Sequence, residues 1–89
     1  MLPLFEEVWQ RIRAHQGEWF TQIRGAKFTY KSPNGFVEPD RTPQRISRSH
    51  FETAYRWVPL ENTVSIQHLR GPSYIYAILM DKRIRKDDW

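Results

Sequence analysis

Apolar residues near the start of the chain recur with the spacing of an amphipathic helix. The positions at i, i+3, i+4 and i+7 are Phe5, Val8, Trp9 and Ile12. Such residues share one face of a helix. Acidic residues come first along this stretch and basic residues come last, an order that suits the helix dipole. The pattern predicts a helix over residues 2–16 that ends at Gly17.

A second stretch with helical spacing lies in the middle of the chain. Its apolar positions are Phe51, Ala54, Tyr55 and Val58. Two helix starts remain open. Ser49 with Glu52 three residues later would form a capping box, whereas Ser47 as N-cap would set Ile46 against the first apolar position as a hydrophobic staple. The proline at position 59 ends the helix, because it disfavours helical geometry in the preceding residue and has no N–H.

Between these helices the pattern changes to the alternation of β-strands. Gly25-Ala26 suits a two-residue type II′ turn, which would place Thr21 opposite Tyr30. The apolar face of this hairpin would then carry Trp19, Thr21, Ile23, Phe28 and Tyr30. The polar face would carry Phe20, Gln22, Arg24, Lys27, Thr29 and Lys31. We predict this register because a slip of one residue would mix the two sets.

A second turn follows at Ser32-Pro33-Asn34-Gly35, which suits a type I turn in a bulged hairpin. It would bring residues 36–38 beside residues 27–31 and complete a three-stranded antiparallel meander. Residues 39–44 contain two prolines, so we interpret them as a loop rather than a central strand.

The last third of the chain is less clearly patterned. Alternation over residues 64–68 predicts a short fourth strand or an extended segment. Residues 74–81 fit helical and strand spacing equally well. The Gly71-Pro72-Ser73 before them and the charges after them favour a short helix. Residues 82–89 are charged, and we expect them to fray.

Together these elements predict a single α+β domain over residues 1–89, in the order α-β-β-β-α-(β)-α. An antiparallel sheet of three to four strands would be covered by helices on one face. At 89 residues the core must be efficient, and an aromatic content of 15% supplies large apolar side chains. The absence of cysteine excludes a disulfide framework and a thiolate zinc site.

We expect neither a membrane-spanning segment nor an export signal in the chain. Its longest apolar run, residues 74–80, is far shorter than the roughly 20 residues that span a bilayer. Glu6 and Glu7 stand where a secretory signal would carry basic residues. We therefore expect a cytoplasmic protein.

The net charge of +4 is concentrated in the central unit, where residues 24–58 hold seven cationic and three anionic side chains. Arg41, Arg45 and Arg48 approach a helix N-terminus, whose free N–H groups attract anions. With the cations of the polar hairpin face and one exposed ring, they suit single-stranded nucleic acid. The predicted nucleic-acid-binding residues are Phe20, Arg24, Lys27, Lys31, Arg41, Arg45 and Arg48. The alternative is a solvated rim on which the arginines pair with Glu38, Asp40 and Glu52, at about 0–1 kcal/mol per pair.

Other chemistry finds little support. The three histidines, at positions 15, 50 and 68, have no metal-ligand spacing. Pro39-Asp40 begins like a metal-dependent nuclease pattern, but no lysine stands two residues after Glu52 or Glu61. No glycine-rich phosphate loop is present. We therefore assign no catalytic residue, no metal ligand and no cofactor.

Three blocks of the chain resemble a family of small uncharacterised bacterial domains. They begin at Gly25-Ala26-Lys27-Phe28, at Arg41-Thr42 (continuing through Phe51-Glu52) and at Gly71-Pro72-Ser73-Tyr74 (continuing through Asp81 and Ile84). The resemblance covers about residues 25–84. It implies a bacterial origin and a free-standing module, and it implies no activity, cofactor or site residue.

These observations favour a small non-enzymatic binding module whose basic face meets nucleic acid or another polyanion. The alternative is a protein-interaction or homodimerisation module that docks through Tyr55, Trp57 and the C-terminal aromatic segment. An enzyme comes third, because its catalytic residues would have to be dispersed along the chain.

Overall fold

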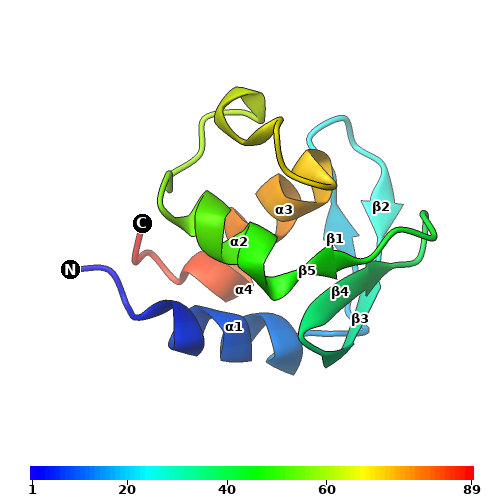
Figure 1. The fold of residues 1–89 in the computed structure, drawn as a ribbon, viewed down its shortest axis with the longest axis horizontal. Helices are drawn as coiled ribbons and strands as arrows, with labels where there is room; N and C mark the ends of the chain where they lie inside the picture. The colour runs from blue at the N-terminus through cyan, green and yellow to red at the C-terminus, as the bar shows by residue number, and fades with distance from the viewer.

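The computed structural model describes all 89 residues as an α+β fold with two small antiparallel sheets (Figure 1). The helical elements are α1 (Phe5–Ala14), α2 (Arg48–Tyr55), the 3-10 helix η1 (Val64–Ile66), α3 (Pro72–Leu79) and α4 (Lys82–Arg85). The strands are β1 (Phe20–Thr21), β2 (Lys27–Phe28), β3 (Tyr30–Asn34), β4 (Phe36–Pro39) and β5 (Ile46–Ser47). The class and, roughly, the order of the elements agree with the prediction.

Both helices with clear apolar spacing are confirmed. The four apolar positions of α1 are all buried, and the helix is shorter than predicted by a few residues at each end. In α2 the choice between two starts is settled in favour of Ser47 as N-cap. Ile46 and Phe51 are both fully buried on either side of that start, as a hydrophobic staple requires. The Ser47 hydroxyl contacts that of Ser49 at 2.7 Å rather than capping a backbone N–H.

The predicted register of the first hairpin is wrong. Thr21 pairs with Lys27 rather than with Tyr30, a shift of three residues. The strands are joined by a three-residue loop that ends at Gly25, whose φ is +93°. Gln22 N donates to Ala26 O at 2.8 Å and closes this loop. Such loops place a glycine with positive φ at their last position, whereas the predicted type II′ turn places it first.

An odd shift in register exchanges the two faces of one strand relative to the other. Phe20 is therefore buried, while Trp19 and Ile23 are exposed, the reverse of the prediction for all three. Phe28 and Tyr30 are buried as expected. The helices pack against this side of the chain, so it faces the core. Within this hairpin, the predicted faces are wrong only for β1 and the residues next to it.

The predicted three-stranded meander is divided between two sheets. β1 pairs only with β2, and β3, β4 and β5 form the second sheet. The β3–β4 hairpin is confirmed, with a bulge, and Lys31 lies opposite Glu38. Its third strand is β5, which lies after the predicted loop and at the predicted helix start, and Val37 pairs with Ile46 there. Pro39 is buried at the end of β4 rather than in a loop.

The C-terminal half is helical. The predicted strand over residues 64–68 is the 3-10 helix η1 instead, with Ile66 as its buried residue. The choice of a helix for residues 74–81 is confirmed by α3. Residues 82–89, expected to fray, form α4 and then return to the core, where Trp89 is only 9% exposed. Trp89 Nε1 donates to Leu79 O at 2.9 Å.

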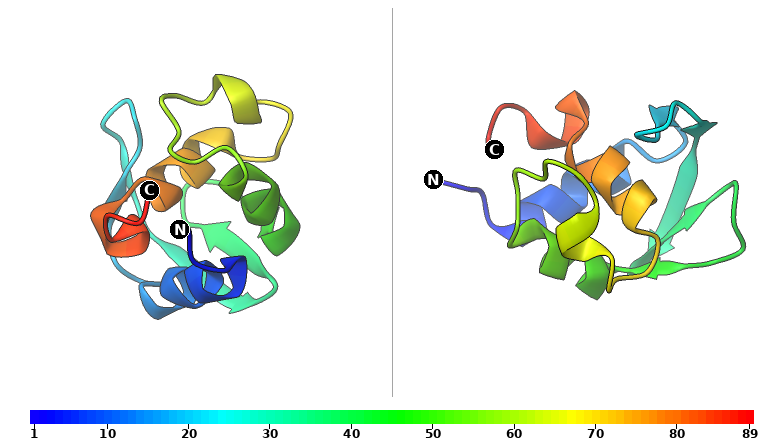
Figure 2. Two further views of the ribbon diagram at one scale, coloured as in Figure 1. Left: turned by 90° about the vertical axis from the view of Figure 1, so that its left-hand side faces the viewer. Right: turned by 90° about the horizontal axis from the view of Figure 1, so that it is seen from above.

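The strands gather at one end of the molecule, and both chain termini lie at the other, as Figures 1 and 2 show. We call residues 20–47, which hold all five strands, the strand end. The helices pack around a single cluster of 20 buried apolar side chains, to which both sheets contribute. None of the helices is long and apolar enough to cross a lipid bilayer.

Candidate nucleic-acid interface

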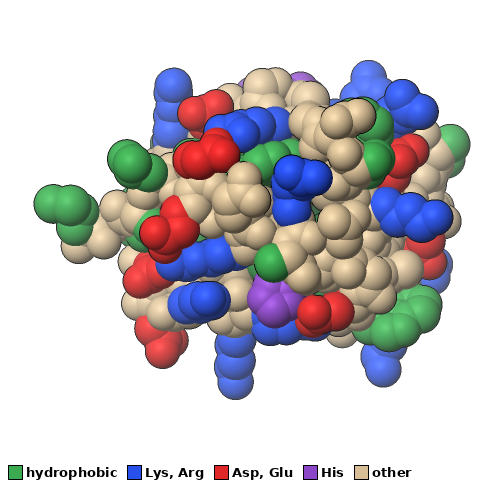
Figure 3. Space-filling view, turned by 90° about the horizontal axis from the view of Figure 1, so that it is seen from below, with side chains coloured by type: hydrophobic (Ala, Val, Ile, Leu, Met, Phe, Trp, Pro, Cys, Tyr) green, Lys and Arg blue, Asp and Glu red, His purple; other side chains and the backbone are tan.

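The strand end carries most of the net positive charge. It holds five cationic and two anionic side chains, a net charge of +3 out of +4 for the whole chain. The cationic residues are Arg24, Lys27, Lys31, Arg41 and Arg45. On the face seen in Figure 3, Lys and Arg side chains are interspersed with Asp and Glu. The excess charge therefore belongs to the strands and their loops rather than to the helices.

Two of these cations project from the strands. Lys27 and Lys31 are exposed, while Phe28 and Tyr30 between them are buried in the core. Successive side chains of a strand point to opposite faces, which agrees with exposed lysines on either side of the buried rings. Both lysines are exposed, as predicted. Thr29, between the two rings, is partly exposed and donates its N–H to Asp40 Oδ1 at 3.0 Å.

Four of the five cations have no ionic partner within the protein. Arg24, Lys27, Lys31 and Arg41 are exposed and take part in none of its ion pairs. Arg24 lies in the β1–β2 loop and Arg41 in the loop after β4. Their charges are available to an external anion.

Arg45 is only partly engaged. Its Nε lies 3.4 Å from Glu38 Oε2, and its side chain stays 67% exposed. Its guanidinium carbon lies 4.8 Å from the centre of the Phe36 ring. Of the pairs that the rim alternative requires with Glu38, Asp40 and Glu52, this is the one that forms.

Arg48 was predicted to be a free cation, but it has an ionic partner in the structure. Its Nη2 lies 2.5 Å from Glu6 Oε2 on α1. Its guanidinium also lies over the rings of Phe5 and Trp9, at 5.4 and 5.8 Å. Hydrogen bonds from Arg48 and Gln10 lower the pKa of Glu6. Arg48 thus joins α2 to α1 and is a structural residue.

Phe20 was predicted to be an exposed ring, and this is wrong. It is 1% exposed and packs against Phe28 and Tyr30, with ring centres 6.0 and 5.2 Å away. The guanidinium of Arg83 lies 3.9 Å from its ring centre on the remaining side. No ligand base can reach this ring.

The exposed ring is that of the preceding residue, Trp19, which is 61% exposed. Together with Thr21 and Lys27 it borders an open hollow of about 390 Å³. Adjacent residues of an extended chain face opposite ways, so we expect one of the two rings at positions 19 and 20 to be outside. The sequence contained this signal, but the register decided which ring it was.

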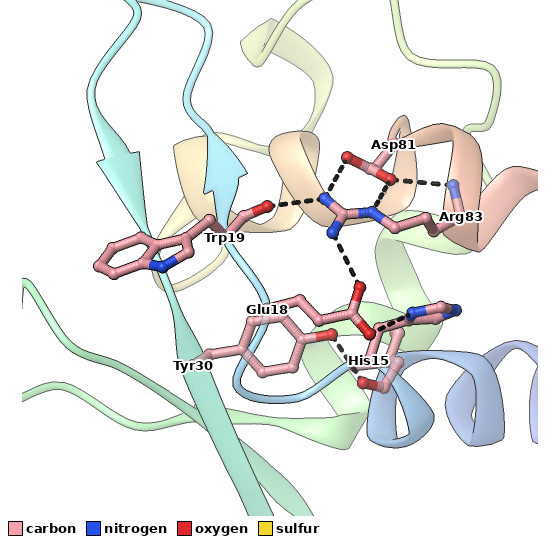
Figure 4. A network of polar contacts seen from close by, with 7 residues as sticks. His15, Glu18, Trp19, Tyr30, Asp81 and Arg83 are labelled. Atoms are coloured by element: carbon pink, nitrogen blue, oxygen red, sulfur yellow. Dashed lines mark hydrogen bonds and ion pairs between the residues drawn. The ribbon is translucent and has the colours of Figure 1, made fainter.

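A network of ion pairs holds the backbone at Trp19 (Figure 4). Arg83 Nη2 donates to Trp19 O at 2.8 Å, and Nη1 contacts Glu18 Oε1 at 2.9 Å. Arg83 also binds the Asp81 carboxylate through Nε and Nη2, at 2.8 and 2.9 Å. His15 Nδ1 lies 2.9 Å from the second Glu18 oxygen. The network joins the end of α1, the start of β1 and α4.

The network shifts the acidity of its carboxylates. Burial raises the pKa of Asp81. Hydrogen bonds from the side chain and backbone of Arg83 lower this pKa by a larger amount, so the net shift is downward. Hydrogen bonds from His15 and Arg83 lower the pKa of Glu18. Hydrogen bonding to Asp81, which outweighs burial, raises the pKa of Arg83. All three groups are thus favoured in their charged forms.

We expect the protein to lose stability in acid partly through this network. A carboxylate whose pKa is lower in the folded state stabilises the fold above its unfolded pKa, and loses that effect as pH falls through the folded value. The ordinary pKa is 3.8 for an aspartate and 4.5 for a glutamate, and the folded-state pKa of Asp81 and of Glu18 lies below these values. Between about pH 7 and about pH 2.5, the melting temperature of Asp81→Asn should therefore fall by less than that of the wild type.

Thermal unfolding followed by circular dichroism measures this difference. Glu52→Gln is the matched control, since Glu52 is exposed and forms no ion pair in the protein. Parallel acid profiles for wild type and Asp81→Asn would contradict the role of the network.

Two further predictions concern metal ligands and the alternative docking surface. The structure has no group of three or more His, Cys, Asp or Glu side chains that could hold a metal ion. His50 Nδ1 accepts a hydrogen bond from Arg70 N, at 2.9 Å. Of the aromatic residues predicted to dock a partner, Tyr55 and Trp89 are buried and contact each other, and only Trp57 is strongly exposed.

Compared with protein-family models, with curated proteins and with solved structures, the chain matches none.

Proposed function

We propose that this protein is a non-enzymatic module that binds nucleic acid through its strand end. The observation that carries the proposal is the set of four exposed cations without ionic partners: Arg24, Lys27, Lys31 and Arg41. Surface cations of a small protein can pair with neighbouring carboxylates, as Arg48 does here with Glu6. Cations without such a partner can neutralise phosphates without breaking an internal contact.

The arrangement of these cations also supports the proposal. They come from two loops and two strands that the fold brings to one end of the molecule, so we expect their fields to add there. The phosphate backbone of a nucleic acid presents charges at regular intervals, which a surface of this kind can follow. Arg45 adds a fifth contact if the anion displaces its long contact with Glu38.

Binding should weaken steeply with salt. Each neutralised phosphate contributes about 0.7–0.9 to the slope of log affinity against log salt concentration. With three or four contacts, affinity should fall about 20- to 150-fold between about 50 and 200 mM salt.

The triple variant Lys27→Ala, Lys31→Ala, Arg41→Ala should reduce this slope by about 2–3 and weaken binding at low salt, because it removes three phosphate contacts. Fluorescence anisotropy of a labelled oligonucleotide measures both effects. The matched control is Arg56→Ala, Lys82→Ala, Lys86→Ala. It removes the same charge from exposed positions outside the strand end. Equal losses in the two triple variants, or binding that is indifferent to salt, would contradict the proposal.

The alternative of a protein-docking module has less support. Of its predicted contact residues only Trp57 remains, which is 56% exposed. Trp57 and the exposed Val64 border a hollow of about 430 Å³ at the turn after α2. That hollow has no concentration of charge to select a partner, whereas the strand end has one.

A further inference from the structure

The exposed indole of Trp19 is the one large apolar ring beside the unpaired cations of the strand end. It borders the same hollow as Thr21 and Lys27, and these two residues are partners across β1 and β2. An exposed tryptophan costs free energy because apolar surface stays in water. Its position next to a free lysine is the combination found where single-stranded nucleic acids bind, with a stacking ring beside a cation for the phosphate.

Trp19 is accessible from more than one side. Besides the hollow at Lys27, it borders a second one of about 260 Å³, whose other lining residues include Tyr76, Met80 and Arg83. Trp19 therefore borders two open hollows rather than packing against a neighbouring element. In Figure 4 it points away from the ion pairs of Arg83. A flat ligand can approach its face without moving a core residue.

The backbone that carries the ring is held in place. Trp19 O accepts a hydrogen bond from Arg83, and Phe20 is anchored in the core directly after it. Before it, Gly17 N donates to Tyr30 O at 2.8 Å. Because the backbone is fixed on both sides of Trp19, a ligand that stacks on the ring has to order only this side chain, which favours affinity.

We propose that this site binds single-stranded nucleic acid by stacking an unpaired base on Trp19, while Lys27 and Lys31 contact the adjoining phosphates. This inference rests on the proposed function and adds the form of nucleic acid to it. In a duplex the faces of the bases are covered by their neighbours, so only the phosphate contacts would remain. The protein should therefore prefer single strands to duplexes of the same sequence, and the preference should depend on Trp19.

The test uses a fluorescein-labelled single strand of about 12 nucleotides, within the site sizes known for single-strand binding folds, and its duplex. Trp19→Ala should bind the single strand about 5- to 150-fold more weakly, the range measured for the loss of one stacked base. Its affinity for the duplex should stay within about twofold, as expected for a surface substitution. Trp19→Phe should recover part of the single-strand affinity, because it keeps a stacking face.

Trp57→Ala is the matched control, since Trp57 is exposed to a similar degree, 56% against 61%, and lies outside the strand end. It should bind both probes as wild type does. Trp57→Phe permits a direct observation, because Trp19 is then the one strongly exposed tryptophan; Trp9 is 3% and Trp89 9% exposed. An unlabelled single strand should quench the fluorescence of Trp57→Phe, and the duplex should leave it unchanged.

The outcomes separate this inference from the function on which it rests. If Trp19→Ala binds the single strand as tightly as wild type while the triple lysine and arginine variant loses affinity, stacking on Trp19 is wrong and the phosphate contacts stand. If wild type binds duplex and single strand equally, the preference is overturned in the same way. If neither probe shows salt-dependent binding, the proposed function and this inference fail together.

Discussion

Replacing Phe20 with alanine should lower the free energy of unfolding by about 3–5 kcal/mol, the usual cost of deleting a buried aromatic side chain. Phe20 is 1% exposed and contacts two core rings, and the guanidinium of Arg83 lies 3.9 Å from its ring centre. The substitution would open a cavity beneath Arg83 and remove a cation–π contact worth about 0.5–1 kcal/mol. Since small domains are stable by only about 5–15 kcal/mol, this loss is a large share of the total.

Urea unfolding followed by tryptophan fluorescence measures the effect, and Trp19→Ala is the matched comparison. The two residues are adjacent, yet Trp19→Ala should change stability by no more than about 0.5 kcal/mol, because its side chain lies outside the core. If Phe20→Ala does not fold, Phe20→Leu should, at a cost below about 1.5 kcal/mol. If Phe20→Ala were as stable as Trp19→Ala, Phe20 would have to lie at the surface, and this would contradict the register of the hairpin.

The helices could be predicted from the sequence because their signal is local. In α1 and α3 the apolar spacing, or the turn residues before it, identify the element without reference to the rest of the chain. The start of α2 illustrates the limit of such signals. Ser47 and Ser49 both offered a plausible N-cap, and the burial of Ile46 in β5 decided between them. That burial depends on pairing with β4, which is distant in sequence.

The register of the first hairpin could not be predicted, because Gly25 satisfies two different turns. A glycine with positive φ can stand first in a two-residue loop or last in a three-residue loop. The two choices place either Trp19 or Phe20 in the core, and both rings are apolar enough for it. Packing against Arg83 and Tyr30 favours Phe20, and Arg83 lies more than sixty residues away along the chain.

The residues of the candidate site likewise divide into those predicted from local signals and those that depend on contacts with distant residues. Lys27, Lys31 and Arg41 were predicted to be exposed from strand alternation and loop composition, both of which are local properties. Arg48 was misplaced because its partner, Glu6, lies on another helix. Trp19 was missed because its exposure follows from the register. Charge at the surface could thus be predicted from the sequence, whereas the ring that gives the surface its proposed selectivity required the fold.

The C-terminal segment leads to the second large expected effect. Trp89→Ala should lower the free energy of unfolding by about 3–5 kcal/mol, although the residue follows a run of charged side chains that predicted a frayed tail. Its ring packs edge-on against Tyr55 at 5.2 Å between ring centres, and its Nε1 donates to Leu79 O at 2.9 Å. The substitution would leave a cavity between α2 and α3 and a buried carbonyl without its donor.

Denaturant unfolding of two further variants separates the parts of this effect. Trp89→Phe keeps most of the apolar contact with Tyr55 but loses the hydrogen bond to Leu79, so it should cost about 1–2 kcal/mol. Lys86→Ala, an exposed neighbour on the same segment, should cost less than about 0.5 kcal/mol. The order Trp89→Ala, Trp89→Phe, Lys86→Ala is what a packed segment requires, because the cost then follows the contacts each side chain makes. A frayed segment would give three values near zero, and residues 82–89 would then contribute nothing to the core or to the hydrogen bond from Arg83 to Trp19 O.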